Sequence, residues 1–133
     1  MFKLSRRSLE RLEGVDKRIL SIINLALSIT KIDFGVPQYG GVRSEDEQHK
    51  LFVDGKSKAD GRYKKSYHQS GKAVDLFAYV NGAATWDVVY MAQLASSMLQ
   101  AANILGYRLE WGGLWDNFID MPHFELKDDN VPI

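Results

Sequence analysis

The sequence predicts a single α+β domain, covering residues 1–133, in which helices pack beside short strands. A chain of 133 residues suits one hydrophobic core rather than two. Two long segments, 15–30 and 87–105, repeat apolar residues every three or four positions, as amphipathic helices do. Shorter runs at 32–36 and 73–80 are strand-like and are bounded by turn residues.

The first of these helices contains the most apolar stretch of the chain, at 19–29. This stretch is far shorter than the roughly 20 residues that a membrane-spanning helix needs. Acidic residues precede it (Glu10, Glu13 and Asp16), and no small-residue cleavage site follows, so it is a poor signal peptide. We therefore expect a buried core helix, no membrane insertion and no export signal in the chain.

The strand at 32–36 ends at Pro37, and a second helix is predicted shortly after it. Ser44, with Glu47 three residues later, forms a capping box, so this helix should run from Ser44 to about residue 53. Arg43 lies just before it, where a cation opposes the helix dipole. Two interpretations are open: the guanidinium points into a cleft, or the side chain is exposed and packs through its aliphatic part.

A basic loop follows this helix, at residues 54–65. It is either an ordinary solvated loop or the rim of a cleft that admits an acidic polymer. His49, on the helix before it, is expected at the surface.

The second half of the chain contains the remaining predicted elements. The strand at 73–80 ends at a turn formed by Asn81 and Gly82, and the long helix at 87–105 ends at Gly106. Residues 107–111 alternate like a strand, and a last short strand begins at His123. The tail from Asp128 onward is expected to be exposed.

Composition excludes several kinds of chemistry. The chain has no cysteine, so disulfides, thiolate catalysis and Cys-ligated zinc are all excluded. A metal site would have to use Asp, Glu or the three histidines, His49, His68 and His123. The formal net charge is zero, which gives no support for nucleic-acid binding.

Three residues far apart in the chain have the composition of a catalytic zinc site. His68, Asp75 and His123 would supply three nitrogen or oxygen ligands and leave a fourth position open. Asp120 should lie on the loop before the last strand, because Pro122 prevents a regular central strand there. Glu125 shares the face of His123 and could accept a hydrogen bond from it.

The residues alone leave other interpretations open. His68 could cap a loop, and His123 could be a hydrogen-bonded residue of the core. In the metal-site interpretation, Asp120 would accept the proton of the attacking water. Arg43 would hold either a substrate carboxylate or the developing oxyanion.

Three segments of the chain, in this order, resemble the signatures of one peptidase family. They are Gly41-Val42-Arg43-Ser44 with Gln48, then Ser66-x-His68-x-x-Gly71-x-Ala73-x-Asp75, and then Asp120-x-x-His123-x-Glu125-Leu126. The family is that of the zinc peptidases that cut bacterial cell-wall peptides. It includes the VanX and VanY types and the L-alanyl-D-glutamate endopeptidases of phages and bacilli.

The resemblance implies a fold and a role for each matching residue. The implied fold is Hedgehog/D-Ala-D-Ala peptidase-like: a small antiparallel sheet carries the zinc site, and helices pack on one side. The resemblance assigns Zn²⁺ to His68, Asp75 and His123. It makes Asp120 the general base and Arg43 the residue that stabilises substrate or transition state. Ser66 and Gln48 also match and are assigned to substrate binding.

The implied function is hydrolysis of the L-Ala–D-Glu bond in peptidoglycan stem peptides, and the chain is most similar to a phage endolysin. The alternatives are a D,D-carboxypeptidase or dipeptidase on the same fold, or a catalytically inactive wall-binding module. We expect a monomer without a nucleic-acid partner. An endolysin without an export signal would accumulate in the host cytoplasm and reach the wall once a separate protein had permeabilised the membrane.

Overall fold

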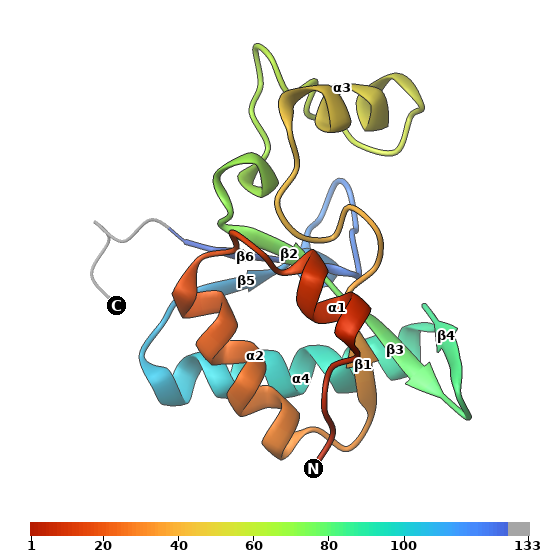
Figure 1. The fold of residues 1–133 in the computed structure, drawn as a ribbon, viewed down its shortest axis with the longest axis vertical. Helices are drawn as coiled ribbons and strands as arrows, with labels where there is room; N and C mark the ends of the chain where they lie inside the picture. The colour runs from red at the N-terminus through yellow and green to blue at the C-terminus, as the bar shows by residue number, and fades with distance from the viewer. Residues whose placement is uncertain (128–133) are drawn as a thin grey trace.

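The computed structural model describes residues 1–127, so the predicted exposed tail from Asp128 lies outside the described residues. Helices α2 (Lys17–Ile29) and α4 (Val88–Leu105) lie on one side of a small sheet formed by β2 (Ala73–Asp75), β6 (His123–Leu126) and β5 (Leu109–Trp111). Helix α3 (Glu45–Val53) stands on the opposite side (Figure 1). The predicted α+β class is confirmed by this arrangement.

Helices α2 (Lys17–Ile29) and α4 (Val88–Leu105) pack against each other and form the base of the molecule. Each begins at an aspartate whose side chain accepts a backbone hydrogen bond, Asp16 in α2 and Asp87 in α4. The length and composition of α4 would also suit a membrane span. Both helices are core helices, however, because their facing side chains are fully buried: Ile19, Ile22, Ile23, Met91, Leu94 and Met98.

The sheet that carries the candidate site is antiparallel, with the order β2-β6-β5. Its strands are β2 (Ala73–Asp75), β6 (His123–Leu126) and β5 (Leu109–Trp111). Phe124, at the centre of β6, pairs with Val74 on one side and with Trp111 on the other. Phe124 is fully buried, so the back of this sheet is anchored in the core while its edge residues stay available for chemistry.

A second three-stranded antiparallel sheet, which the sequence did not separate from the first, has the order β1-β3-β4. It contains β1 (Asp33–Gly35), β3 (Phe77–Val80) and β4 (Ala83–Thr85). Strands β3 and β4 form a hairpin whose two turn residues, Asn81 and Gly82, both have positive φ. This backbone is typical of a tight two-residue turn, which explains why an Asn-Gly pair stands there.

The prediction of one continuous strand at 73–80 is wrong, because the chain changes sheets at Leu76. The partner strand β6 is preceded by Pro122, which has no N–H group to donate and so cannot continue the ladder. The backbone N–H of Leu76 still donates to the carbonyl of Pro122 (2.9 Å). Beyond Leu76 the chain pairs with β1 instead, as strand β3.

Helix α1 (Arg6–Arg11) was not predicted, because its sequence is polar and basic. It is tied to the end of the β1 segment through Val36. The backbone N–H of Val36 donates to Ser8 Oγ (2.9 Å), and Arg11 Nη1 donates to the carbonyl of Val36 (2.8 Å). Two long-range hydrogen bonds therefore hold a segment that lacks an apolar stripe.

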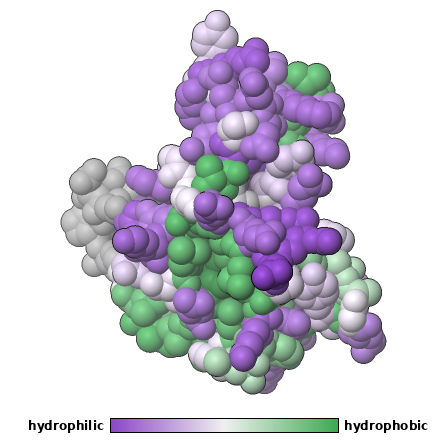
Figure 2. All heavy atoms as spheres, in the orientation of Figure 1, coloured by the Kyte–Doolittle hydropathy of each residue, from purple (hydrophilic) through white to green (hydrophobic). Residues whose placement is uncertain are grey.

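Helix α3 (Glu45–Val53) begins where the sequence predicts, and both hydrogen bonds of the capping box between Ser44 and Glu47 are present. The loop after it, residues 54–65, leads to a short 3₁₀ helix, η1 (Tyr67–Ser70). Figure 1 shows α3 and this loop projecting above the sheet, and Figure 2 shows that their surface is mostly hydrophilic. His49 is half-buried rather than at the surface, because its Nδ1 donates to the carbonyl of Asp60 (3.0 Å).

Candidate metal centre

His68 is placed by the turn that leads into β2. The hydroxyl of Ser66 accepts from the backbone N–H of His68 and caps η1 (3.2 Å). The helix ends at Gly71, whose φ of 76° is in the left-handed region. A Cβ at Gly71 would lie 2.7 Å from the carbonyl oxygen of Gly14, so this close approach also requires glycine.

Asp75 and His123 are direct partners across strands β2 and β6, and His68 lies beside them. Three atoms converge: His68 Nε2, His123 Nδ1 and Asp75 Oδ1, with each pair 3.2 Å apart. In residues 1–127, this is the one group of three histidine or acidic side chains whose ligand atoms are close enough to hold a common ion.

The outer nitrogen of each imidazole is already engaged. His68 Nδ1 donates to the carbonyl of Gly41 (2.9 Å), and His123 Nε2 donates to the carboxylate of Glu125 (2.7 Å). These acceptors fix the tautomers, so a neutral His68 and a neutral His123 both direct a lone pair inward. Two lone pairs and a carboxylate oxygen then face one another, which is unfavourable unless a proton or a cation lies between them.

The dimensions of this group suit a tetrahedral zinc ion. Zinc binds nitrogen and oxygen ligands at about 2.0–2.1 Å, which places tetrahedral ligand atoms about 3.3 Å apart. The three separations of 3.2 Å match one face of such a tetrahedron. His68, Asp75 and His123 would therefore fit such an ion, and all three line the same cleft.

The ionisation of the group reflects the same need for positive charge. Burial alone would raise the pKa of Asp75, but His68 and His123 outweigh it and hold that pKa far below the usual value. Burial opposes protonation of His123, yet the hydrogen bonds to Asp75 and Glu125 raise its pKa to about 9. In the metal-free protein, a proton on His123 would occupy the place that a cation takes.

Arg43 points into the cleft, which is the first of the two interpretations that the sequence left open. Its Nη2 donates to Asp75 Oδ2 (2.9 Å), on the carboxylate oxygen that does not face the histidines. Its Nε donates to the carbonyl of Tyr39 (2.7 Å), and its Nη1 donates to Gln48 Oε1 (2.9 Å). The guanidinium is thus held in one orientation and keeps two N–H donors for a ligand.

Asp120 lies in the turn before β6, as Pro122 led us to expect. The backbone N–H of His123 donates to the carbonyl of Asp120 (3.1 Å), and the carboxylate of Asp120 lines the same cleft as His68 and Arg43. Burial first, and then the charge of Asp75, raise the pKa of Asp120. A carboxylate with a raised pKa in the same cleft as His68, Asp75 and His123 is suited to accept a proton.

The two residues assigned to substrate binding have different positions. Ser66 lines the cleft and is half-buried, although its hydroxyl also caps η1. Gln48 is fully buried and is not among the described residues that line the cleft, so any part it has in substrate binding would be indirect. Its Nε2 donates to Ser57 Oγ and to the carbonyl of Ala59 (both 2.8 Å), and its Oε1 accepts from Arg43, so it holds Arg43 against the 54–65 loop.

The cleft has a volume of about 360 Å³ and lies between the 54–65 loop and the loop that joins β5 to β6. The latter loop contributes Trp115 and Phe118, which the motifs did not single out. The ring of Trp115 lies 5.1 Å from the ring of His123, and Lys58 Nζ lies 4.9 Å above the centre of the Phe118 ring. The sequence signal that could have indicated a loop at this position is the glycine pair before Trp115, Gly112-Gly113.

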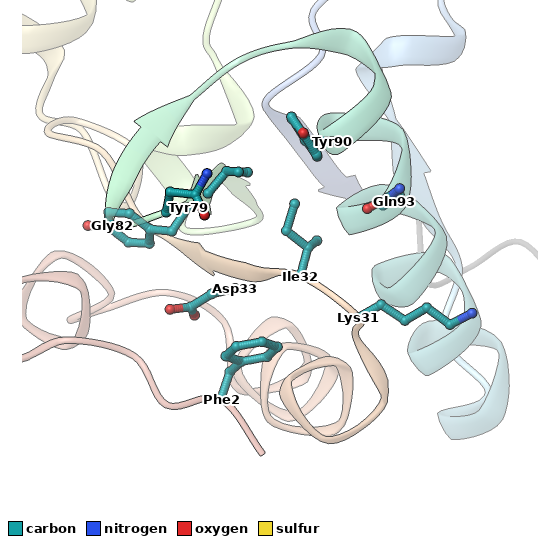
Figure 3. A pocket seen from close by; sticks show the side chains of 10 residues that line it. Phe2, Lys31, Ile32, Asp33, Tyr79, Gly82, Tyr90 and Gln93 are labelled. Atoms are coloured by element: carbon teal, nitrogen blue, oxygen red, sulfur yellow. The ribbon is translucent and has the colours of Figure 1, made fainter.

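A larger hollow, of about 630 Å³, lies elsewhere, between β1, β3 and α4 (Figure 3). Phe2, Tyr79 and Tyr90 line it, with Asp33 as its acidic residue among the described ones. It shares no lining residue with the cleft over the metal group. The volume of a hollow therefore does not identify the candidate site. The site is identified by the side chains of His68, Asp75 and His123, whose ligand atoms lie close together.

Comparison with known proteins agrees with this geometry. Residues 1–127 match the family described as phage L-alanyl-D-glutamate peptidase. The chain belongs to this family. The resemblance that the three sequence segments indicated is thereby confirmed, and the match covers both loops of the cleft and all three candidate ligands.

Several members of this group can be compared individually. The L-alanyl-D-glutamate peptidase of Escherichia phage T5 is 28% identical over 127 residues, which cover 95% of this chain and 90% of that protein. The peptidoglycan L-alanyl-D-glutamate endopeptidase CwlK of Bacillus subtilis is 33% identical over 97 residues, or 65% of this chain and 57% of that protein. The matched part thus spans a little over half of CwlK.

The fold is also shared with a solved structure. The L-Ala D-Glu endopeptidase ChiX of Serratia marcescens superposes with a TM-score of 0.82 and 35% identity, over 94% of this chain and 90% of that one. The fold that the motif resemblance implied is confirmed by this likeness.

Proposed function

We propose that this chain is a zinc-dependent endopeptidase that hydrolyses the L-Ala–D-Glu bond of peptidoglycan stem peptides. The observation that carries the proposal is the convergence of His68, Asp75 and His123, whose inner atoms are spaced 3.2 Å apart and need a cation between them. Membership of the family, and the names of its phage and bacterial relatives, support the choice of bond.

Five residues of the cleft have a direct role in this proposal. His68, Asp75 and His123 would hold Zn²⁺, which supplies Lewis-acid polarisation of the scissile carbonyl and a lowered pKa for an attacking water. Asp120 accepts the proton of that water and passes it to the leaving amine nitrogen. Arg43 directs its two unused N–H groups at the carbonyl oxygen, where negative charge develops.

Supporting groups keep these residues in place. Glu125 orients His123, and the carbonyl of Gly41 orients His68. Ser66 lines the same cleft and would contact the bound peptide there. The phage relatives support host-cell lysis as the biological setting, with the cell wall as the place of action.

A digest of purified peptidoglycan tests the proposal. Mass spectrometry of the products should show cleavage between L-Ala and D-Glu with zinc present, and a chelator should abolish it. The D75N variant, which lacks a charged ligand, should behave like the chelated protein. Release of terminal D-Ala alone would favour a D,D-carboxypeptidase, and the absence of any zinc-dependent product would favour an inactive wall-binding module.

A further inference from the structure

One wall of the cleft is strongly cationic. Of the residues in 1–127 that line the cleft, five are lysine or arginine and three are aspartate or glutamate. The three acids, Asp75, Asp120 and Glu125, belong to the strands and the turn around the metal group. The four lysines all come from the other side: Lys56, Lys58, Lys64 and Lys65. A chain with zero net charge has therefore gathered positive charge along one side of its site.

The backbone that carries these lysines is fixed, although it has little regular secondary structure. Gln48 binds it at Ser57 and Ala59, as described above. Asp60 Oδ1 accepts from three successive backbone N–H groups, those of residues 62–64, at 2.8–3.0 Å. The carbonyl of Gly61 accepts from Gln69 Nε2 (2.9 Å), which joins the loop to η1. The four lysines thus project from the 54–65 loop, whose backbone is held in place by these hydrogen bonds.

Two of the four lysines already have partners within the protein. Lys65 Nζ contacts Glu45 Oε1 (3.3 Å), and Lys58 Nζ lies above the ring of Phe118. Within residues 1–127, by contrast, the ammonium groups of Lys56 and Lys64 have no hydrogen-bond or ion-pair partner. Both line the cleft, so among its four lysines these two have ammonium groups that remain available to a ligand.

We propose that Lys56 and Lys64 form a subsite for a free carboxylate of the substrate, on the amine side of the bond that is cut. This inference rests on the proposed function. In the stem peptide, D-Glu is joined to the next residue through its γ-carboxyl group, so its α-carboxylate stays free beside the scissile nitrogen. The next residue can carry a second free carboxylate. The lysine wall faces this anionic stretch, while the ligands and Asp120 face the carbonyl.

Synthetic peptides distinguish the two possible carboxylates. The substrate is N-acetyl-L-Ala-γ-D-Glu-L-Lys, compared with one peptide amidated at the D-Glu α-carboxylate and another amidated at the terminal L-Lys carboxylate. Because exposed charge pairs are screened, we expect amidation of the recognised group to lower kcat/KM of the wild-type enzyme by about five- to tenfold. The peptide that shows the loss identifies the carboxylate.

Variants link the preference to the two lysines. K56Q/K64Q should cleave the free and amidated peptides with similar kcat/KM, while K56R/K64R should retain the preference because it keeps the charge. K17Q/K50Q removes the same charge at exposed positions outside the cleft and should behave like the wild type. Thermal melts of all variants confirm that they are folded.

The outcomes separate this proposal from the one on which it rests. If the wild type cleaves all three peptides equally well, or if K56Q/K64Q keeps the full preference, the subsite is refuted and the peptidase activity stands. If the wild type cleaves none of the peptides in the presence of zinc, the proposed function itself fails.

Discussion

Replacing Asp120 by asparagine removes the proposed proton acceptor and little else. Within residues 1–127 the carboxylate of Asp120 makes no hydrogen bond, so the isosteric amide breaks no contact. It also removes a negative charge that burial first, and then the charge of Asp75, disfavour in the wild type, where they raise the pKa of Asp120. The free energy of unfolding of D120N should therefore stay within about 0.5 kcal/mol of the wild-type value, or rise slightly.

The effect on the reaction should be large. General acid–base groups contribute about 10²–10⁴-fold to rate, so kcat/KM on an L-Ala–D-Glu peptide should fall by roughly that factor. This equals about 3–5 kcal/mol of transition-state stabilisation. D120E should recover part of the activity, because it restores a carboxylate one methylene farther out.

The assay pairs steady-state kinetics with the zinc content of each purified variant. D116N is the matched control, because Asp116 lies on the same loop but is exposed and does not line the cleft. D120N should retain one zinc per chain and lose activity, while D116N should keep both. A zinc-loaded D120N that works at the wild-type rate would show that Asp120 is not the base.

Two further predictions concern residues that hold the fold and the site together. Q48L leaves Arg43 Nη1 and a loop carbonyl without partners in a buried position, so it should lower the free energy of unfolding in urea by about 3 kcal/mol and also reduce kcat/KM. Q100L, at an exposed position of α4, should change neither. Arg18 lowers the pKa of Asp16, the N-cap of α2, to about 2. Because the pKa of this carboxyl in the unfolded chain is about 4, its ionised form stabilises the folded state fully above that pH. D16A should lower the free energy of unfolding in urea by about 1 kcal/mol at pH 7, and its difference from the wild type should shrink as the pH falls from about 4 toward 2. A difference that stays constant over that range would contradict the role of the charge.

The convergence of His68, Asp75 and His123 could be predicted in part from the sequence, because local rules place the first two of these residues. Ser66 and Gly71 mark the start and the end of the turn that carries His68, and β2 begins two residues after Gly71. The pairing of Asp75 with His123 is different, since 48 residues separate them and no local rule fixes their register. The sequence groups Asp75 with His123 by residue type alone, and the resemblance of both segments to one family then assigns them to a single site.

The features that the sequence analysis predicted wrongly or missed also have physical causes. The split of the predicted strand at Leu76 depends on Pro122, a residue distant in sequence that ends the partner strand. Helix α1 is held by contacts with Val36 that its own polar sequence does not reveal. The motif match also does not reveal how deeply Gln48 is buried: its side chain has no exposed surface and bonds to Arg43 and to the 54–65 loop.

Gln48 also joins the two halves of the cleft. A continuous path of hydrogen bonds runs from the 54–65 loop through Gln48 and Arg43 to Asp75, and so to the atoms that would hold the ion. Asp75 uses one carboxylate oxygen for Arg43 and the other for the two imidazoles. A shift of the 54–65 loop would therefore be transmitted to Asp75 through two side chains, those of Gln48 and Arg43. Both ends of this path face the same cleft. The loop whose lysines would recognise the substrate and the residues that would cleave it are therefore held in position by the same hydrogen bonds.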